Sequence, residues 1–560
     1  MEFEQKAEEK KMSMSKNIAR LAVTAGLTAA LSFGGVMAPV TMAFAAEANG
    51  SVTIGKASGN DTEFMGYKIF DADVAKDENG QTLVSNIAWA NDKVGDAVKK
   101  AIEEFHTGAK IATAQDAADW ISENVMHTGQ TTSVASDSAA HKIAAAVAKV
   151  TDPDDPSDYA ATSNGVANNL SHGYWLFVTN ALTVAGTETA TAPIFAVVGD
   201  EPVLITEKTS IPTVDKQVRE GDAWGKVSDS YIGEEVEYKL TGSVASNIDT
   251  FTKYEYTFQD HLSVGLEAIE DSVEVKINDK AIQPENGYTV GLDATKDVSG
   301  NLTGGHDLTI SFTDLKTAAK AAGVKLTGDS KVVVTYKAKL TEKAEYKGTG
   351  NTNKVELVYS NNPMTGDKGT SESDQVSDYV FGLDVTKTDP DNKSANLVAG
   401  FKVKMIKEGT TKKVSKWLKK DGSFTDDENQ AYTFKTTEEG NKVLIPGLVE
   451  GTYLISESET PAGYNTIADF EITVTPTYNA TGMLTELKAE PNSGMVTGAD
   501  VKNPTTTQIS ISIQNKKGTG LPLTGLNGVT FTWIAGGAVL CIGVAHLIRS
   551  RKQAEESEQE

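Results

Sequence analysis

The chain has 560 residues and a formal net charge of −25, and it has no basic block that could follow a nucleic-acid backbone. An acidic chain of this kind repels phosphate groups, so nucleic acid is excluded as a partner. The single cysteine, Cys541, leaves the chain without an intramolecular disulfide, so another device has to hold it together.

Residues 1–45 have the features of a leader and signal peptide. An apolar, Ala- and Gly-rich stretch begins at Ile18 and ends in Ala43-Phe44-Ala45, the small-x-small pattern that signal peptidase cleaves. The charged segment before it is unlike the usual start of such a signal, so Met12 and Met14 are candidate start residues. We therefore expect the protein to be exported.

The mature chain, about Ala46 to Thr524, is long enough for about three domains and begins with a segment of mixed pattern, residues 46–210. Strand-like runs alternate there with stretches in which apolar residues recur at helical spacing. These stretches lie near Val94, near Ala117 and over His141 to Val150. We predict an α+β N-terminal domain.

From Ile211 onward the pattern changes to short β-branched or alternating runs separated by Gly, Asn and Asp turns. This pattern is typical of β-sandwiches. It predicts a second domain at 211–375 and a third at 379–517, with the polar stretch from Asn361 to Asp378 as a linker. The predicted fold class is mainly β, with tandem immunoglobulin-like sandwiches after the α+β domain.

In the second domain, polar side chains lie in phase with the apolar residues of their strands. Successive side chains of a strand point to opposite faces, so Lys216, Asp260 and Asn353 are all predicted to point inward with their apolar neighbours. The neighbours in phase are Val214 and Val218 for the lysine, Tyr254, Tyr256 and Phe258 for the aspartate, and Val355, Leu357 and Tyr359 for the asparagine.

The third domain repeats this arrangement of a lysine, a carboxyl and an amide on inward faces. Lys387 follows Phe381, Leu383 and Val385 in phase, Glu457 follows Tyr453 and Ile455, and Asn515 follows Ile509, Ile511 and Ile513. The same triad is therefore predicted in both domains.

A buried triad of this kind can react. Desolvation lowers the pKa of a lysine toward the neutral, nucleophilic amine and raises that of a carboxyl group toward its protonated form. The acid would polarise the asparagine carbonyl and shuttle protons while the amine attacks and ammonia leaves. The product is a Lys–Asn isopeptide bond that ties the first strand of a domain to its last. Each residue alone is also compatible with a snorkelling lysine or a polar strand end, but recurrence in phase favours the reactive interpretation.

The C-terminal segment, residues 521–560, has the layout of a sorting signal. The pentapeptide Leu521-Pro522-Leu523-Thr524-Gly525 precedes an apolar run from Val529 to Ile548, which is long enough for a transmembrane helix, and a basic stop from Arg549 to Lys552. The alternative is an ordinary single-pass anchor. The pentapeptide fits the LPxTG signal of Gram-positive sortase substrates, and this resemblance implies cleavage after Thr524 and transfer of Thr524 to an amine.

Four segments resemble Gram-positive fimbrial shaft subunits, the sortase-assembled backbone pilins with self-formed isopeptide bonds. The segments are Tyr67–Asp71, Pro212–Lys216, Gly350–Pro363 and Gly451–Tyr464, of which the last is similar to the E-box of that family.

The resemblance implies Cna-type sandwiches, with a Cna B-type third domain in which Glu457 is the catalytic acid and Asn515 the reacting asparagine. In the second domain Asp260 is the chosen acid and Asn353 the chosen asparagine. Glu267 and Glu270 remain alternatives for the acid, and Asn351 for the asparagine.

Backbone pilins also use a lysine that accepts the acyl group of the next subunit, and Lys208 has the corresponding place. The local sequence Leu204-Ile205-Thr206-Glu207-Lys208 lacks the Tyr-Pro pair that usually precedes this lysine. Because Val203 and Ile205 would occupy the opposite face of the strand, we expect Lys208 to be exposed. An ordinary surface lysine is the alternative.

The resemblance implies a pilus-specific sortase, identical subunits in a linear covalent polymer, ancillary pilins and cell-wall peptidoglycan as partners, and a host glycan or protein as a ligand. The expected location is the Gram-positive cell surface, after transient membrane insertion. A monomeric wall-anchored adhesin or an ancillary tip or base pilin is the alternative.

Enzyme motifs are absent from the sequence, which contains no Gly-x-Ser-x-Gly, HExxH or phosphate-binding loop. The acidic turn Asp152–Asp158 lacks the glycine of a calcium loop. We expect no cofactor and no metal. We also expect no turnover enzyme, because each triad would react once and consume itself.

Overall fold

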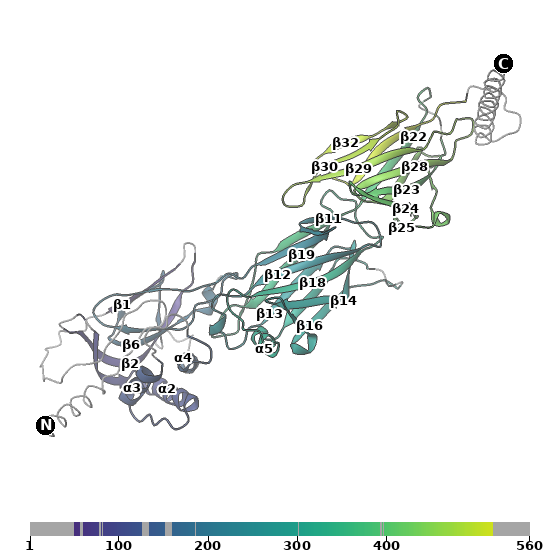
Figure 1. Ribbon diagram of the computed structural model, residues 1–560. Helices are drawn as coiled ribbons and strands as arrows, with labels where there is room; N and C mark the ends of the chain where they lie inside the picture. Colours follow the sequence, from purple (N-terminus) through teal and green to yellow (C-terminus); the bar gives the residue numbers. More distant parts are fainter. Residues whose placement is uncertain are drawn as a thin grey trace, which may run out of the picture.

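The computed structural model describes residues 50–518 apart from 57–59, 78–79, 81, 126–133, 152–158, 185, 299, 301, 393–394 and 396. The described chain forms three parts that follow one another along an elongated molecule (Figure 1). The expected signal peptide, acidic turn and sorting signal lie outside the described residues. None of the described helices is long and apolar enough to cross a bilayer.

The first part combines two small sheets with helices, so the expectation of helices in the N-terminal region is confirmed. One sheet has the order β5-β1-β8 and the other the order β3-β2-β6-β7, with β4 paired to β2. Helix α3 begins at a capping box in which Thr113 and Asp116 bond each other's backbone. The elements are β1 Gly50–Gly55, β2 Phe64–Lys76, β3 Thr82–Trp89, α2 Asp92–Phe105, α3 Ala114–Asn124, α4 Ala139–Val150, β4 Ala160–Ala161, β5 Val166–Leu170, β6 Gly173–Thr179, β7 Ile194–Val198 and β8 Val203–Thr206.

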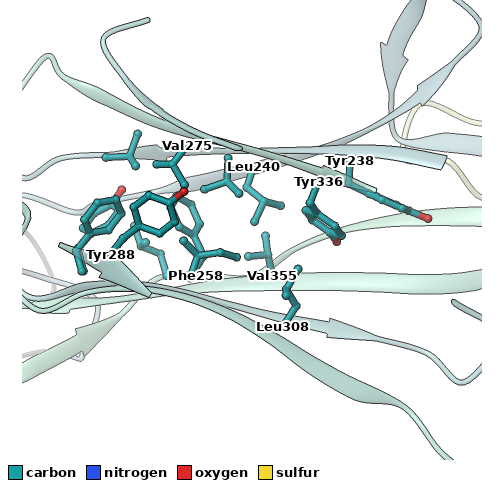
Figure 2. Packing of buried hydrophobic residues seen from close by; sticks show 14 of the residues in the cluster. Tyr238, Leu240, Phe258, Val275, Tyr288, Leu308, Tyr336 and Val355 are labelled. Atoms are coloured by element: carbon teal, nitrogen blue, oxygen red, sulfur yellow. The ribbon is translucent and has the colours of Figure 1, made fainter. Parts of the chain in front are cut away.

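The second part is a sandwich of two sheets whose apolar side chains meet between them (Figure 2). One sheet has the order β10-β9-β12-β18-β14-β15, and the other the order β11-β21-β19-β13-β17-β16, with β20 paired to β19. The elements are β9 Val214–Glu220, β10 Ala223–Gly225, β11 Val227–Asp229, β12 Glu235–Ser243, β13 Tyr256–Leu262, β14 Leu266–Ile277, β15 Lys280–Ile282, β16 Tyr288–Asp293, β17 His306–Phe312, α5 Leu315–Ala321, β18 Lys331–Leu340, β19 Asn351–Ser360, β20 Lys368–Thr370 and β21 Asp374–Tyr379.

The linker expected from Asn361 to Asp378 is wrong, because this stretch contains β20 and most of β21, and both strands pair with β19. Its acidic residue Asp378 is buried, and one of its carboxyl oxygens accepts hydrogen bonds from the hydroxyl groups of Ser228 and Ser230. The asparagine-bearing strand β19 is therefore not the last strand of the second part.

The third part is also a sandwich, so the expectation of a mainly β protein with several sandwiches is confirmed. Its sheets have the orders β27-β22-β33-β31 and β25-β24-β23-β28-β29-β30-β32, with β26 paired to β23. The first and last strands, β22 and β33, are parallel neighbours. The elements are β22 Phe381–Thr388, β23 Gly400–Glu408, β24 Lys412–Leu418, β25 Phe424–Thr425, β26 Phe434–Lys435, β27 Lys442–Leu448, β28 Gly451–Glu459, β29 Phe470–Tyr478, β30 Leu484–Pro491, β31 Val496–Thr497, β32 Ala499–Lys502 and β33 Gln508–Gln514.

Candidate functional site

The second part brings a lysine, a carboxyl and an amide together between its two sheets. Lys216 lies on β9 of one sheet, whereas Asp260 on β13 and Asn353 on β19 belong to the other. All three residues are 0% exposed. Alternation along each strand accounts for their inward direction, because each occupies the core-facing phase of its strand. This lysine and carboxyl lie in contact, and the cluster joins one sheet to the other.

A fourth residue, Tyr336 on β18, completes this cluster. Lys216 Nζ lies 2.6 and 2.7 Å from the two carboxyl oxygens of Asp260 and 3.2 Å from the Tyr336 hydroxyl oxygen. The hydroxyl group donates to Asp260 Oδ2 at 2.5 Å and accepts from Asn353 Nδ2 at 2.6 Å. Sequence reasoning missed this tyrosine, because an aromatic residue on an apolar strand face is ordinary core.

The orientation of the Asn353 amide follows from the hydrogen count of its neighbour. When the Asp260 carboxyl group accepts the hydroxyl hydrogen of Tyr336, the hydroxyl oxygen accepts from the NH2 group of Asn353. The carbonyl oxygen of Asn353 has no hydrogen-bond partner among the described residues. The leaving nitrogen of Asn353 therefore faces the Tyr336 hydroxyl group, and its carbonyl oxygen makes no hydrogen bond to Asp260. This differs from the expected polarisation of the carbonyl by the acid.

Burial sets the protonation states in this cluster. Desolvation lowers the pKa of Lys216, while the attraction and hydrogen bonds of Asp260 act in the opposite direction. Desolvation, followed by the charge of Asp260, raises the pKa of Tyr336 well above its usual value. The lysine is thereby brought closer to its neutral, nucleophilic form, and the tyrosine remains protonated.

The alternative residues of the second part lie elsewhere. Asn351 uses its amide for backbone contacts, since its Oδ1 accepts from the Glu345 N–H at 2.9 Å and its Nδ2 donates to the Asp378 carbonyl at 3.2 Å. Glu267 is partly exposed and pairs with Lys296, and Glu270 is exposed. The structure thus brings Asp260, and neither glutamate, to the lysine.

The third part holds a second cluster of the same composition. Lys387 Nζ on β22 lies 2.9 Å from Glu457 Oε1 on β28, and both side chains are 0% exposed. This contact has the distance of an ion pair, although its angles are not those of a hydrogen bond. Asn515, directly after β33, donates from Nδ2 to the carboxyl oxygens of Glu457 at 2.9 and 3.2 Å. Here the acid contacts the amide directly.

The environment of this second cluster resembles that of the first. Desolvation lowers the pKa of Lys387, and its close contact with the charged carboxyl group of Glu457 opposes that shift. The backbone N–H of Ile467 donates to Glu457 Oε2 at 3.0 Å and fixes the carboxyl group. The carbonyl oxygen of Asn515 has no hydrogen-bond partner among the described residues.

The position of Lys208 differs from the expectation of an exposed strand residue. Strand β8 ends at Thr206, so Lys208 lies beyond it, and the residue is half-buried. The alternation of buried and exposed residues continues past the end of the strand, because Ile205 and Glu207 are both buried. The backbone N–H of Lys208 then bonds Thr191 Oγ1 at 3.1 Å, and this contact packs the segment against the first part. Strand phase alone could not predict that contact.

Two other expected site features concern metal binding and the sorting motif. Across the part of the chain that the structure describes, no group of three or more His, Cys, Asp or Glu side chains could hold a metal ion. The pentapeptide Leu521 to Gly525, including Thr524, lies outside the described residues.

Comparison with known proteins relates the chain to surface proteins of Gram-positive bacteria. Residues 382–488 match the family model "SpaA: Prealbumin-like fold domain". The "Trypsin-resistant surface T6 protein" of Streptococcus pyogenes serotype M6 is 24% identical over 319 residues, which are 53% of this chain and 51% of that protein. The chain therefore spans about half the length of this curated relative.

Solved structures of major pilins also align with the chain. The T6 backbone pilin of Streptococcus pyogenes aligns with a TM-score of 0.47 and 16% identity, over 84% of this chain and 99% of that one. The major pilin SpaD of Corynebacterium diphtheriae aligns with a TM-score of 0.43 and 17% identity, over 84% of this chain and 98% of that one. The major pilin SpaA of the same species aligns with a TM-score of 0.42 and 15% identity, over 84% of this chain and 100% of that one. The resemblance to Gram-positive backbone pilins is confirmed by these comparisons.

Proposed function

We propose that the chain is the shaft subunit of a covalently polymerised pilus on a Gram-positive cell surface. In this proposal it is a structural protein, not a turnover enzyme, and its sandwich domains are of the immunoglobulin-like Cna type, the third of the B type. Intramolecular Lys216–Asn353 and Lys387–Asn515 isopeptide bonds stabilise it. The observation that carries the proposal is the recurrence of a fully buried Lys–acid–Asn cluster in two sandwiches.

Each cluster has the groups that amide transfer requires. The neutral lysine amine attacks the amide carbon of the asparagine, and a Nζ–C bond forms. The C–Nδ2 bond then breaks, and ammonia leaves after the acid has moved one proton from the amine to the leaving nitrogen. Positioned acid–base groups and a desolvated amine both lower the barrier to such a step. Asp260 and Glu457 are the acids in this account, and neither is consumed.

The bonds would bear load along the fibre. In the third part, Lys387 and Asn515 lie on or beside parallel neighbouring strands, the first and the last of the sandwich. A bond between them would let tension pass from the end of the chain to β22 without unfolding the strands in between. In the second part the bond would join β9 to β19 across the two sheets, leaving β20 and β21 outside the closed loop.

Polymerisation is the second half of the proposal. A pilus-specific sortase would cleave after Thr524 in Leu521–Gly525 and join it to a lysine of the next identical subunit, for which Lys208 is the candidate. Ancillary pilins, peptidoglycan and a host glycan or protein complete the proposed partners. The SpaA structure points to a modular pilus assembly with stabilising isopeptide bonds in that protein, and we extend the same two features to this chain.

An extract of the cell wall, separated under denaturing conditions, tests this function. A shaft subunit is expected to give a ladder of covalent multimers that react with antibody to this chain. A single band attached to the wall would contradict the proposal and favour a monomeric adhesin or an ancillary pilin instead.

A further inference from the structure

The two clusters differ in how the acid reaches the asparagine. In the third part, Glu457 accepts directly from Asn515 Nδ2 at 2.9 Å. In the second part the acid is an aspartate, which is one methylene shorter, and the Tyr336 hydroxyl group lies between it and the asparagine. The hydroxyl oxygen is 2.5 Å from the Asp260 carboxyl group and 2.6 Å from Asn353 Nδ2.

We propose that Tyr336 is a catalytic residue of the second part, whose hydroxyl group relays a proton from Asp260 to the leaving nitrogen of Asn353. This inference rests on the proposed isopeptide chemistry. It assigns to the second part a four-residue mechanism, in place of the three-residue mechanism of the third.

The relay starts from the neutral form of the contacting pair, in which the proton shared by Lys216 and Asp260 lies on the carboxyl group. Attack of Lys216 Nζ on the Asn353 amide carbon gives a tetrahedral adduct with an extra proton on Nζ and a negative oxygen. In the adduct Nδ2 is an amine with a free lone pair, so both hydrogen bonds of Tyr336 can reverse. The hydroxyl group then gives its proton to Nδ2 and takes the carboxyl proton of Asp260. The carboxylate then takes the extra proton from Nζ, the C–Nδ2 bond breaks, and ammonia leaves. Asp260 and Tyr336 return to their starting forms.

The surroundings hold Tyr336 in position for this task. The residue is 1% exposed, and its ring stacks on Tyr238, with ring centroids 5.3 Å apart and planes inclined by 18°. Figure 2 shows the two rings side by side at one end of the core, away from Tyr288. Burial and the charge of Asp260 raise the pKa of Tyr336, so its hydroxyl group can donate and accept at once without losing its proton permanently.

Mass spectrometry of the mature chain tests the relay. In Tyr336→Phe, formation of the Lys216–Asn353 bond is expected to slow by about 100-fold or more, the scale of acid–base catalysis. Freshly purified protein should therefore lack that bond in peptide maps and acquire it slowly. The Lys387–Asn515 bond in the same molecules should be complete. Tyr254→Phe is the matched control, because Tyr254 is equally buried and has no hydrogen bond to the cluster.

A second variant separates catalysis from packing. A glutamate at position 260 has one more methylene group and could reach Asn353 without the tyrosine. Asp260→Glu is therefore expected to restore bond formation in the Tyr336→Phe chain. Protease resistance is compared between Asn353→Ala and Asn353→Ala with Tyr336→Phe, neither of which can form the bond. Equal protease resistance of these two variants supports a chemical role for Tyr336. Unfolding of the double variant would overturn that role, because Tyr336 would then be needed for packing.

The relay and the proposed function fail in different ways. A complete Lys216–Asn353 bond in freshly purified Tyr336→Phe would overturn the relay and leave the isopeptide chemistry intact. Absence of both bonds in the wild-type chain would contradict the proposed function itself.

Discussion

Asn515 donates its amide hydrogens to both carboxyl oxygens of Glu457, and this contact lies fully inside the third sandwich. The acid is therefore in place to protonate the nitrogen that would leave, and Lys387 Nζ is in place to attack, 2.9 Å from the same carboxyl group. Removal of the acid should consequently stop the reaction in this part alone.

Glu457→Ala is expected to raise the intact mass by one ammonia, apart from the mass of the substitution, because the Lys387–Asn515 bond would not form. The bond of the second part should remain. Glu459→Ala is the matched control, since this exposed glutamate of the same strand pairs with Lys435 on the surface. Loss of ammonia from both sites in Glu457→Ala would show that the glutamate is not the acid.

Asn515→Ala should make the third part less stable and open it to protease. A cross-link between β22 and β33 restricts the unfolded chain as a long-loop disulfide does, with a contribution of about 4 to 5 kcal/mol on the entropy model. Thermal unfolding and limited proteolysis measure the change. Gln514→Ala, one residue earlier, is the control and should be nearly neutral. Reducing agent should change neither protein, and equal protease resistance of Asn515→Ala and wild type would refute the cross-link.

The stability of the region where the second and third parts meet should depend on pH. Burial raises the pKa of Asp378 to about 7, and desolvation raises that of Glu234 to about 7 as well. Further acidic groups face these two, namely Glu220, Asp229 and Glu408, and Glu408 is paired with Lys412. In the folded protein these carboxyl groups are therefore more stable in the protonated form than in the charged form.

The sign of this dependence follows from the direction of the shifts. A carboxyl group whose pKa is raised on folding stabilises the folded state below its unfolded pKa, and this contribution is lost as the pH rises through about 7. Thermal unfolding should thus occur at higher temperature near pH 5 than near pH 8. Asp378→Asn keeps an oxygen for Ser228 and Ser230 and should flatten the profile. An unchanged pH dependence in this variant would assign the effect to other groups.

Lys208→Ala should abolish the polymer ladder and leave the monomer attached to the wall, because the sorting signal is intact while the acceptor amine is missing. Thr524→Ala should instead retain the precursor in the membrane. Lys76→Ala, a more exposed lysine of the same part, is the control. If the ladder persists in Lys208→Ala, another lysine is the acceptor.

Strand alternation was sufficient to predict the inward direction of Lys216, Asp260 and Asn353, because the side-chain period is local information. It could not predict Tyr336, whose role arises only where β18 faces β13 and β19 across the sandwich. Strand β21 was missed for a similar reason. Its polar residue Asp378 accepts hydrogen bonds from serines far away in the sequence, so the local pattern resembles a linker.

The end of β8 was equally beyond the local pattern. The half-buried position of Lys208 depends on a contact with Thr191, which comes from a different segment of the first part. Pairing and packing of distant segments therefore account for what the sequence did not reveal, whereas composition and period were enough for the sandwich architecture.

The most direct test of the account is the intact mass of the recombinant mature chain. Two buried Lys–acid–Asn clusters predict a mass that falls short of the sequence mass by two ammonia molecules, with no added enzyme or cofactor. A mass equal to that of the plain sequence would contradict the account, because the clusters would then be ordinary buried ion pairs.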